Sequence, residues 1–135
     1  SPERSIGMYV MPYEHDPRSE AVIGSAIDVH RTLDPGLLEK TYEECLCFEL
    51  DLRRIPYRRQ VPIPVIYKSI NLECGFRADQ LFENALVVDL KAVESLSELH
   101  TAQLLTCMKF SRCRTGLLLN FNSPRLRDGI RRLSL

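Results

Sequence analysis

The chain has 135 residues, 44% of them hydrophobic, with 18 basic and 18 acidic side chains. This length predicts one domain with one sizeable core and excludes two full-sized domains. The balanced net charge points to no class of partner. No apolar run reaches the roughly 20 residues that a membrane-spanning helix needs.

Cysteine is the next informative residue type, with Cys45, Cys47, Cys74, Cys107 and Cys113. An odd count without a CxxC pair argues against a disulfide framework and against a zinc ribbon. We therefore expect these residues to fill apolar space in a reducing compartment. With no signal peptide evident, we expect the protein to be cytoplasmic, or to reside in an organelle with a similar redox state.

The N-terminal third predicts an arm followed by two helices. Residues 1–18 contain three prolines and no clear periodicity, so we expect an arm that packs on a partner, and a domain over 19–135. Apolar residues at helical spacing predict a helix over 19–33. Asp34-Pro35-Gly36 ends it, and a second helix is expected from there to about residue 53.

Strand-like segments follow, and they are predicted at 57–67, 70–81 and 85–93. Pro62 and Pro64 restrict the first of them to an edge or irregular position. The continuous apolar run before Asp89 predicts a central strand that is covered on both faces.

The remaining segments predict a helix at about 97–110, a buried strand at 114–121 and a terminal helix reaching about 133. The element order is then α-α-β-β-β-α-β-α. We therefore expect an α/β fold with a mixed sheet of about four strands flanked by helices.

Asp79, Asp89 and Lys91 form the pattern that carries chemistry. Residues two apart on a strand share a face, so Asp89 and Lys91 point to the same side. A turn near Glu83-Asn84 folds the preceding strand back and places Asp79 opposite Val88 or Asp89. Two facing carboxylates repel, and a hard cation such as Mg²⁺ or Mn²⁺ removes that conflict. The alternative is an ion pair of either aspartate with Lys91 or Arg77.

Charge distribution adds a second observation. Acidic residues dominate between Arg77 and Glu98, whereas basic residues dominate from Lys109 to the C-terminus. A cluster of acidic residues next to basic residues suits a metal site that also holds phosphates. A solvated C-terminal helix explains the basic residues equally well.

The motifs of this chain resemble those of the PD-(D/E)XK nuclease superfamily, in particular its RecB-like branch and the GxxExxY protein family. The matching segments cover about residues 19–133 and include Gly36–Tyr42 for the family signature, Gln60–Val65, Gly75–Asp79, Val87–Val93, His100–Thr106 and Gly116–Phe121. The resemblance implies a restriction-endonuclease-like core and metal-dependent hydrolysis of phosphodiester bonds in DNA or RNA.

The same resemblance implies roles for individual residues. Asp79, Asp89 and the backbone carbonyl of Leu90 would bind Mg²⁺ or Mn²⁺, and Lys91 would be the catalytic lysine. Glu39 would be a further ligand or a base, and Gln103 would orient Lys91 or a phosphate. Contacts to substrate would come from Tyr42, Arg77 and His100, although Tyr42 could equally pack under the sheet and His100 could cap its helix.

Three positions depart from the pattern of the family. Asp89 stands where the family usually has Glu, Cys107 where RecB-like nucleases have Tyr, and Asp34 where a Gly is common. None of these changes removes a proposed metal ligand, but Cys107 puts the transfer of substrate handling in doubt.

Two functions stay open at this point. The first is a magnesium-dependent nuclease. The joint presence of five polar residues favours it: Glu39, Asp79, Asp89, Lys91 and Gln103. The second is an inactive nuclease-like binding or structural subunit, which the small size and neutral charge allow. A homodimer formed through the proline-bearing strand, or a larger complex docked through the arm, is also open.

Overall fold

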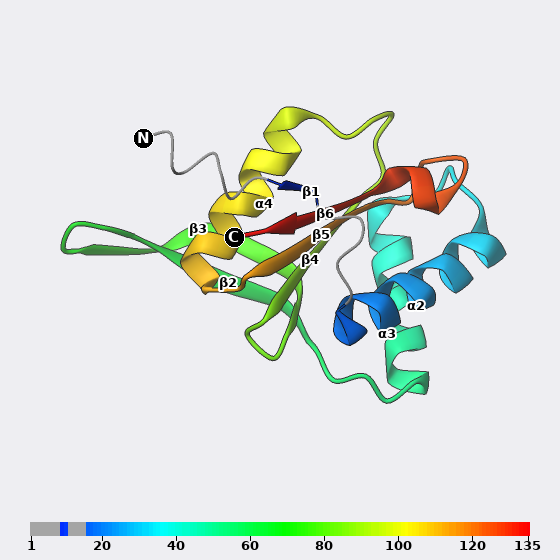
Figure 1. Cartoon of the computed structure of the whole chain (residues 1–135), viewed down its shortest axis with the longest axis horizontal. Coiled ribbons are helices and arrows are strands. Elements are labelled where there is room, and N and C mark those ends of the chain that lie inside the picture. The colour runs from blue at the N-terminus through cyan, green and yellow to red at the C-terminus, as the bar shows by residue number, and fades with distance from the viewer. Residues whose placement is uncertain (1–8, 11–15) are drawn as a thin grey trace.

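The computed structural model describes residues 9–10 and 16–135, and a mixed sheet forms the centre of that part of the chain (Figure 1). Its strand order is β1-β6-β5-β4-β3-β2. The strands are Tyr9–Val10 (β1), Arg58–Tyr67 (β2), Ile70–Phe82 (β3), Leu86–Lys91 (β4), Thr115–Asn120 (β5) and Ile130–Ser134 (β6). Strands β4 and β5 run parallel, and the other neighbours are antiparallel. The predicted α/β class is confirmed, with six strands instead of about four.

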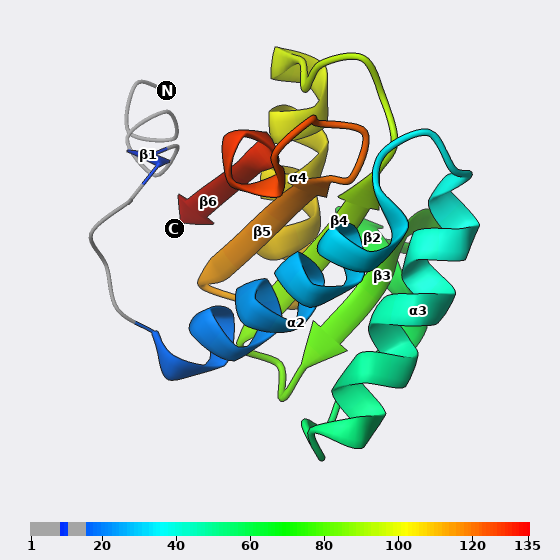
Figure 2. The ribbon, with the colours of Figure 1, turned by 90° about the vertical axis from the view of Figure 1, so that its right-hand side faces the viewer.

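Three helices of the described residues cover the two faces of this sheet (Figure 2). They are Pro17–Leu33 (α2), Glu39–Leu52 (α3) and Glu98–Ser111 (α4). Helices α2 and α3 pack on one face, around a cluster that includes Val22, Tyr42, Phe82 and Phe121. Helix α4 packs on the other face, around Leu104, Met108 and Leu118. Because α4 connects the parallel strands β4 and β5, the chain contains one βαβ crossover.

Helix α2 begins at Pro17, two residues before the predicted start of the domain. Asp16 provides the reason, because its side chain accepts a hydrogen bond from the Arg18 amide at 3.2 Å and Pro17 follows directly. Capping by Asp with Pro in the first turn is a strong start signal. Of the predicted arm, residues 1–8 and 11–15 lie outside the described residues, and Tyr9–Val10 pair with β6.

The predicted terminal helix is wrong. Leu126–Gly129 form a single 3₁₀ turn (η1), and the chain then continues as β6 along β5. Leu126, Ile130 and Leu133 repeat at helical spacing, but β5 is buried and would otherwise present unpaired backbone groups at an edge. Gly129 also needs its small size, since a Cβ there would lie 2.7 Å from the Asn120 carbonyl oxygen.

The turn between β3 and β4 sets the register on which the candidate site depends. Glu83 and Asn84 both have positive φ (52° and 55°), and the Ala85 amide donates to the Phe82 carbonyl at 2.9 Å. The φ values and this hydrogen bond match a type I′ turn, which suits the twist of a hairpin. A two-residue turn of this type would pair Phe82 with Ala85, whereas the strands pair one residue further on, so Ala85 is an extra residue in the loop. The resulting pairs are Phe82 with Leu86, Leu81 with Val87 and Gln80 with Val88. Extended by one residue, this register places Asp79 opposite Asp89, which is one of the two partners, Val88 or Asp89, that the sequence leaves open.

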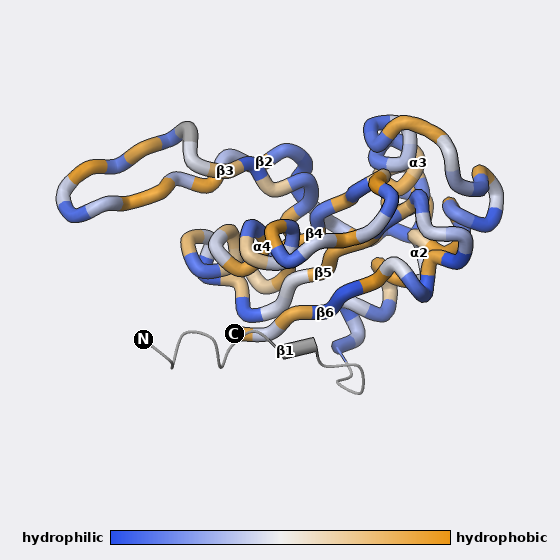
Figure 3. The backbone as a smooth tube through the Cα atoms, turned by 90° about the horizontal axis from the view of Figure 1, so that it is seen from above, coloured by the Kyte–Doolittle hydropathy of each residue, from blue (hydrophilic) through white to orange (hydrophobic). Residues whose placement is uncertain are grey.

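Strands β2 and β3 extend well beyond the rest of the molecule as a long hairpin (Figure 3). Strand β2 is an edge strand, as Pro62 and Pro64 predict, and its register shifts between Ile63 and Val65. The distal part of the hairpin exposes four large apolar side chains, Ile66, Tyr67, Ile70 and Leu72.

Candidate metal centre at the end of strand β4

The β3–β4 ladder stops one residue before the two aspartates, and their side chains take over its hydrogen bonds. Oδ2 of Asp79 accepts from the Leu90 amide at 2.8 Å, and Oδ1 of Asp89 accepts from the Asp79 amide at 3.4 Å. The carboxylates thus bridge two strands that have begun to separate. The amide and carbonyl of one strand residue project to the same side, so the Leu90 carbonyl also faces this opening.

The electrostatics of these aspartates are unfavourable in the absence of a cation. Burial, followed by the charge of the nearby Asp79, raises the pKa of Asp89 to about 6. Burial also raises the pKa of Asp79, with Glu43 adding to the effect. Carboxylates that are desolvated and close together resist ionisation, so a bound cation would relieve an existing repulsion.

Strand β2 contributes a residue that the sequence reasoning missed. Gln60 lies opposite Asp79, and its side-chain amide donates to Asp79 Oδ1 at 3.2 Å and to Glu43 Oε2 at 2.8 Å. Gln60 has a φ of 53°, a left-handed conformation that costs a non-glycine residue about 1 kcal/mol or more. A strained residue that fixes a candidate ligand is a common feature of functional sites.

Helix α3 supplies two glutamates one turn apart. Glu39 is exposed in the first turn, and burial raises its pKa, with Asp79 as the second cause. Glu43 is only 7% exposed and accepts from Arg59 Nε at 2.8 Å as well as from Gln60. The sequence reasoning named Glu39 and missed Glu43, although the spacing of four residues places both on one face of the helix.

Lys91 lies close to the carboxylates without pairing with them. Its positive charge lowers the pKa of Asp89, Asp79 and Glu39. Among the described residues, however, it forms no ion pair with either aspartate, and the Arg77 side chain donates to the Gln60 carbonyl at 3.1 Å. The alternative of a satisfied aspartate–lysine or aspartate–arginine pair is therefore not what the structure contains.

Helix α4 borders the site on the other face of the sheet. His100 is part of a capping box, in which its Nδ1 accepts from the Ser97 amide at 3.0 Å. The proton of the neutral ring is then on Nε2. Gln103 is exposed, and one turn further Cys107 is buried near Asp89; burial, followed by the Asp89 charge, raises the Cys107 pKa to about 12.

Tyr42 lies in the core rather than at the opening. It is 0% exposed, its ring stacks on Phe121 at 4.8 Å between centroids, and its hydroxyl donates to the Asp34 carbonyl at 2.6 Å. The hydroxyl also accepts from the Leu37 amide at 3.0 Å. Tyr42 thus fixes the loop that leads into Glu39, which agrees with the packing alternative and leaves no surface for a substrate contact.

The model of the PD-(D/E)XK nuclease superfamily matches residues 16–133. The chain belongs to the PD-(D/E)XK nuclease superfamily. No curated protein and no solved structure gives a significant match to it. Among the described residues, no helix is both long and apolar enough to cross a membrane.

PD-(D/E)XK nucleases typically use divalent metals, and the donor atoms of this chain fit such an ion. No group of three His, Cys, Asp or Glu side chains among the described residues could enclose a metal by itself. Mg²⁺ does not require one, because it is usually held by one or two carboxylates, with water and substrate phosphates completing its shell. Asp79, Asp89 and the Leu90 carbonyl could hold the ion in that manner.

A cavity of about 600 Å³ opens beside Asp79. Glu39, Glu43, Gln60 and Asp79 line it, together with Lys40 and Arg59. The cavity therefore joins the two glutamates of α3 to the β2–β3 side of the centre. A phosphate group has room to approach Asp79 from this side.

Proposed function

We propose that this protein is a magnesium-dependent phosphodiesterase that hydrolyses nucleic acid, and that it belongs to the GxxExxY group of the RecB-like branch. The observation that carries the proposal is the facing pair Asp79 and Asp89, which bridge separating strands with no cationic side chain paired to them. Such a pair destabilises the fold unless it binds a cation. The hydrogen bonds that the two carboxylates accept from the Leu90 and Asp79 amides do not remove this repulsion.

The proposed roles follow from position. Asp79, Asp89 and the Leu90 carbonyl hold Mg²⁺ or Mn²⁺, which would supply Lewis-acid stabilisation of charge on the phosphoryl oxygens. Lys91, which is close to the carboxylates but not paired with them, stabilises the negative charge that develops on the phosphate. Glu39 accepts the proton of the attacking water, because its raised pKa makes it a better base near neutral pH.

The reaction is an in-line displacement at phosphorus. The water oxygen forms a bond to phosphorus, the phosphorus–oxygen bond to the leaving nucleotide breaks, and the leaving oxygen takes up a proton. His100 and Gln103 both lie on α4, and the charge of Lys91 reaches His100. We assign them contacts to non-bridging phosphate oxygens, for which the Nε2 proton of His100 is suited.

One observation favours the second candidate function, an inactive nuclease-like subunit. The β2–β3 hairpin projects from the molecule with exposed apolar residues (Figure 3), and such a surface is suited to a protein partner. This hairpin leaves the sheet beyond Gln60 and Asp79.

The deciding experiment is cleavage of a supercoiled plasmid and of labelled single strands of DNA and RNA. We expect products with Mg²⁺ or Mn²⁺, none with EDTA, and a loss of at least 100-fold for Asp89→Asn. Glu73→Gln removes an exposed carboxylate from the hairpin and serves as the matched control, with activity like that of the wild type. Folded protein that cleaves none of these substrates and binds no metal in calorimetry would overturn the proposal.

A further inference from the structure

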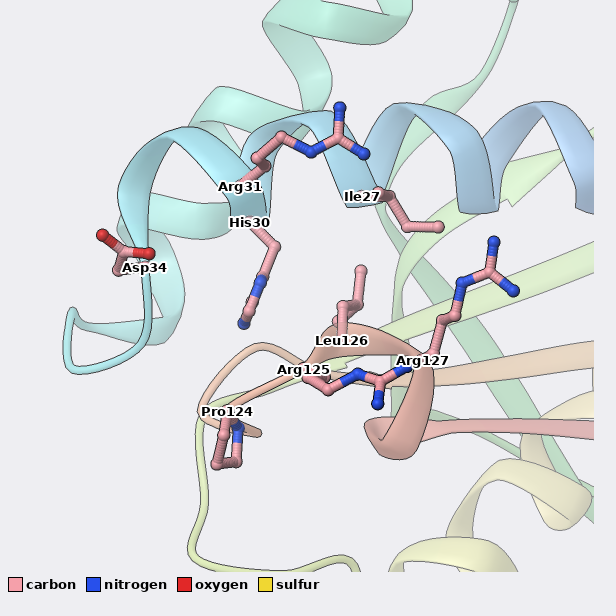
Figure 4. A pocket seen from close by; sticks show the side chains of 8 residues that line it. All are labelled: Ile27, His30, Arg31, Asp34, Pro124, Arg125, Leu126 and Arg127. Carbon is pink, nitrogen blue, oxygen red and sulfur yellow. The ribbon is translucent and has the colours of Figure 1, made fainter.

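A second cavity, of about 330 Å³, lies between the C-terminal end of α2 and the turn η1 (Figure 4). Arg31, Arg125 and Arg127 line it, and Ile27 and Leu126 supply apolar surface. We call it the arginine pocket. None of these residues belongs to the candidate metal centre.

The arginines of this pocket are largely uncompensated. Arg125 and Arg127 are exposed, and neither forms an ion pair with another described residue. Arg31 has a loose contact with Asp28 at 3.6 Å. Asp34 is the acidic residue among those that line the pocket, which also include the three arginines. His30 forms part of the wall and is engaged, with Nε2 at 2.8 Å from the Ser123 carbonyl.

The pocket lies at the same end of the sheet as the metal centre. Strands β4 and β5 are parallel and pair Lys91 with Asn120, so their C-terminal ends lie at the same end of the sheet. The turn η1 follows β5 at that end of the sheet, as Figure 2 shows. By contrast, Arg112 and Arg114 precede β5 and lie at the opposite end. The basic C-terminal third of the sequence is therefore divided between two ends of the molecule, and Arg125 and Arg127 are at the end that carries the carboxylates.

We propose that the arginine pocket binds a backbone phosphate of a nucleic acid that also occupies the metal centre. This inference rests on the proposed function, because it requires that the strand bound at the metal centre also reaches the arginine pocket. Guanidinium groups bind phosphate oxygens through paired hydrogen bonds. The apolar surface from Ile27 and Leu126 suits a sugar or a base next to that phosphate, which a site for a bare anion would not need.

The test compares two double variants that lose the same charge. Arg125→Gln with Arg127→Gln empties the pocket, and Arg112→Gln with Arg114→Gln is the matched control at the far end. Both are made in an Asp89→Asn background and measured in EDTA, so that no strand is cut. Binding of a fluorescent single strand and of the matching duplex is followed by anisotropy over a series of salt concentrations. Circular dichroism checks that each variant is folded.

We expect the pocket variant to bind about tenfold more weakly than the control. For a single strand, the slope of log affinity against log salt should fall by about 0.7, because the pocket binds one phosphate and each neutralised phosphate contributes about 0.7. Inorganic phosphate should displace the strand from the unsubstituted background better than chloride at equal ionic strength. If inorganic phosphate binds but removing the arginines leaves oligonucleotide affinity unchanged, the pocket is a small-anion site and the inference is wrong.

Equal weakening by both double variants would also overturn the inference, because it would mean that affinity follows overall charge. Since this measurement needs neither metal nor cleavage, it is separate from the test of activity. A protein that shows arginine-dependent binding but no cleavage would refute the proposed phosphodiesterase and leave the pocket as a nucleic-acid contact.

Discussion

The side-chain amide of Gln60 on β2 donates a hydrogen bond to Oδ1 of Asp79 on β3, at 3.2 Å. The same nitrogen donates to Glu43, so one amide holds the carboxylate of a candidate ligand and a buried glutamate of α3 together. Gln60 is therefore a positioning residue for Asp79. It does not need to contact the substrate to affect the reaction.

Substitution of Gln60 should separate this positioning from backbone strain. Gln60→Ala and Gln60→Gly both remove the amide, and both should weaken Mg²⁺ binding by about tenfold, as loss of an outer-shell hydrogen bond commonly does. The two should differ in stability, with the glycine variant more stable by about 1 kcal/mol because φ is 53°. Calorimetric metal titration and urea unfolding measure the two effects. Equal metal affinity in wild type and both variants would refute the role.

Asp89→Asn should stabilise the metal-free protein at neutral pH, by about 1–3 kcal/mol. The pKa of Asp89 is raised to about 6 by burial and by Asp79, so the folded state binds a proton more tightly than the unfolded state. Ionisation of Asp89 therefore costs stability above about pH 6, and this cost disappears as the pH falls toward 4. Urea unfolding in EDTA at pH 7.5, 6 and 4 should show the advantage of Asp89→Asn shrinking with pH. An advantage that is the same at all three values would contradict the assignment.

Mg²⁺ should raise the stability of the wild type and not that of Asp89→Asn. A ligand at 100 times its dissociation constant adds about 2.7 kcal/mol to the free energy of unfolding. Because protons compete with the metal at Asp89, the increase should decline below about pH 6. Thermal melts with and without Mg²⁺ at pH 7.5 and 5 measure this, with Glu73→Gln as the control that keeps the full response. A Mg²⁺ response in Asp89→Asn equal to that of wild type would place the ion elsewhere.

Lys91→Met should separate metal binding from catalysis. Lys91 is near the carboxylates but unpaired, so its removal leaves the proposed ligands intact and deletes a charge that stabilises the transition state. We expect cleavage to fall by about 100-fold or more, while the Mg²⁺-induced rise in melting temperature persists. Lys109→Met removes an exposed lysine of α4 and should leave the rate unchanged. Loss of metal binding along with activity would instead make Lys91 a structural residue.

Tyr42→Phe should destabilise the protein by about 1–2 kcal/mol, because it removes the buried hydroxyl that joins the Asp34 carbonyl to the Leu37 amide. Since the loop it closes leads into Glu39, the cleavage rate should fall more than the affinity for substrate. Urea unfolding and steady-state kinetics test the two parts. A variant with normal stability and a raised KM would indicate a substrate contact for Tyr42 instead.

The sequence was sufficient where short-range chemistry decides the structure. The Glu83-Asn84 turn narrowed the partner of Asp79 to Val88 or Asp89, and the alternation of strand residues placed Lys91 on the side of Asp89. Pro62 and Pro64 marked β2 as an edge strand. These features depend on neighbours in the chain, so their pattern can be read without the fold.

Other features depend on contacts between distant segments, and they could not be predicted. The position of Gln60 requires a left-handed residue within β2, and no residue type nearby signals it. Glu43 resembles any other helical glutamate until Arg59 and Gln60 are placed beside it. The C-terminal segment fits a helix by its spacing, and only the open edge of β5 makes it a strand.

The hydrogen bond from the Leu90 amide to Asp79 makes that amide a reporter within the site. Its proton is bonded to a carboxylate rather than to a strand carbonyl, so its nuclear magnetic resonance shift should change with whatever that carboxylate binds. Val88, two residues earlier, pairs with Gln80 within the intact β3–β4 ladder. Its amide therefore provides an internal reference for the shift of the Leu90 amide. Occupancy of the metal centre is therefore measurable at one backbone position, in the wild-type chain and without any substrate.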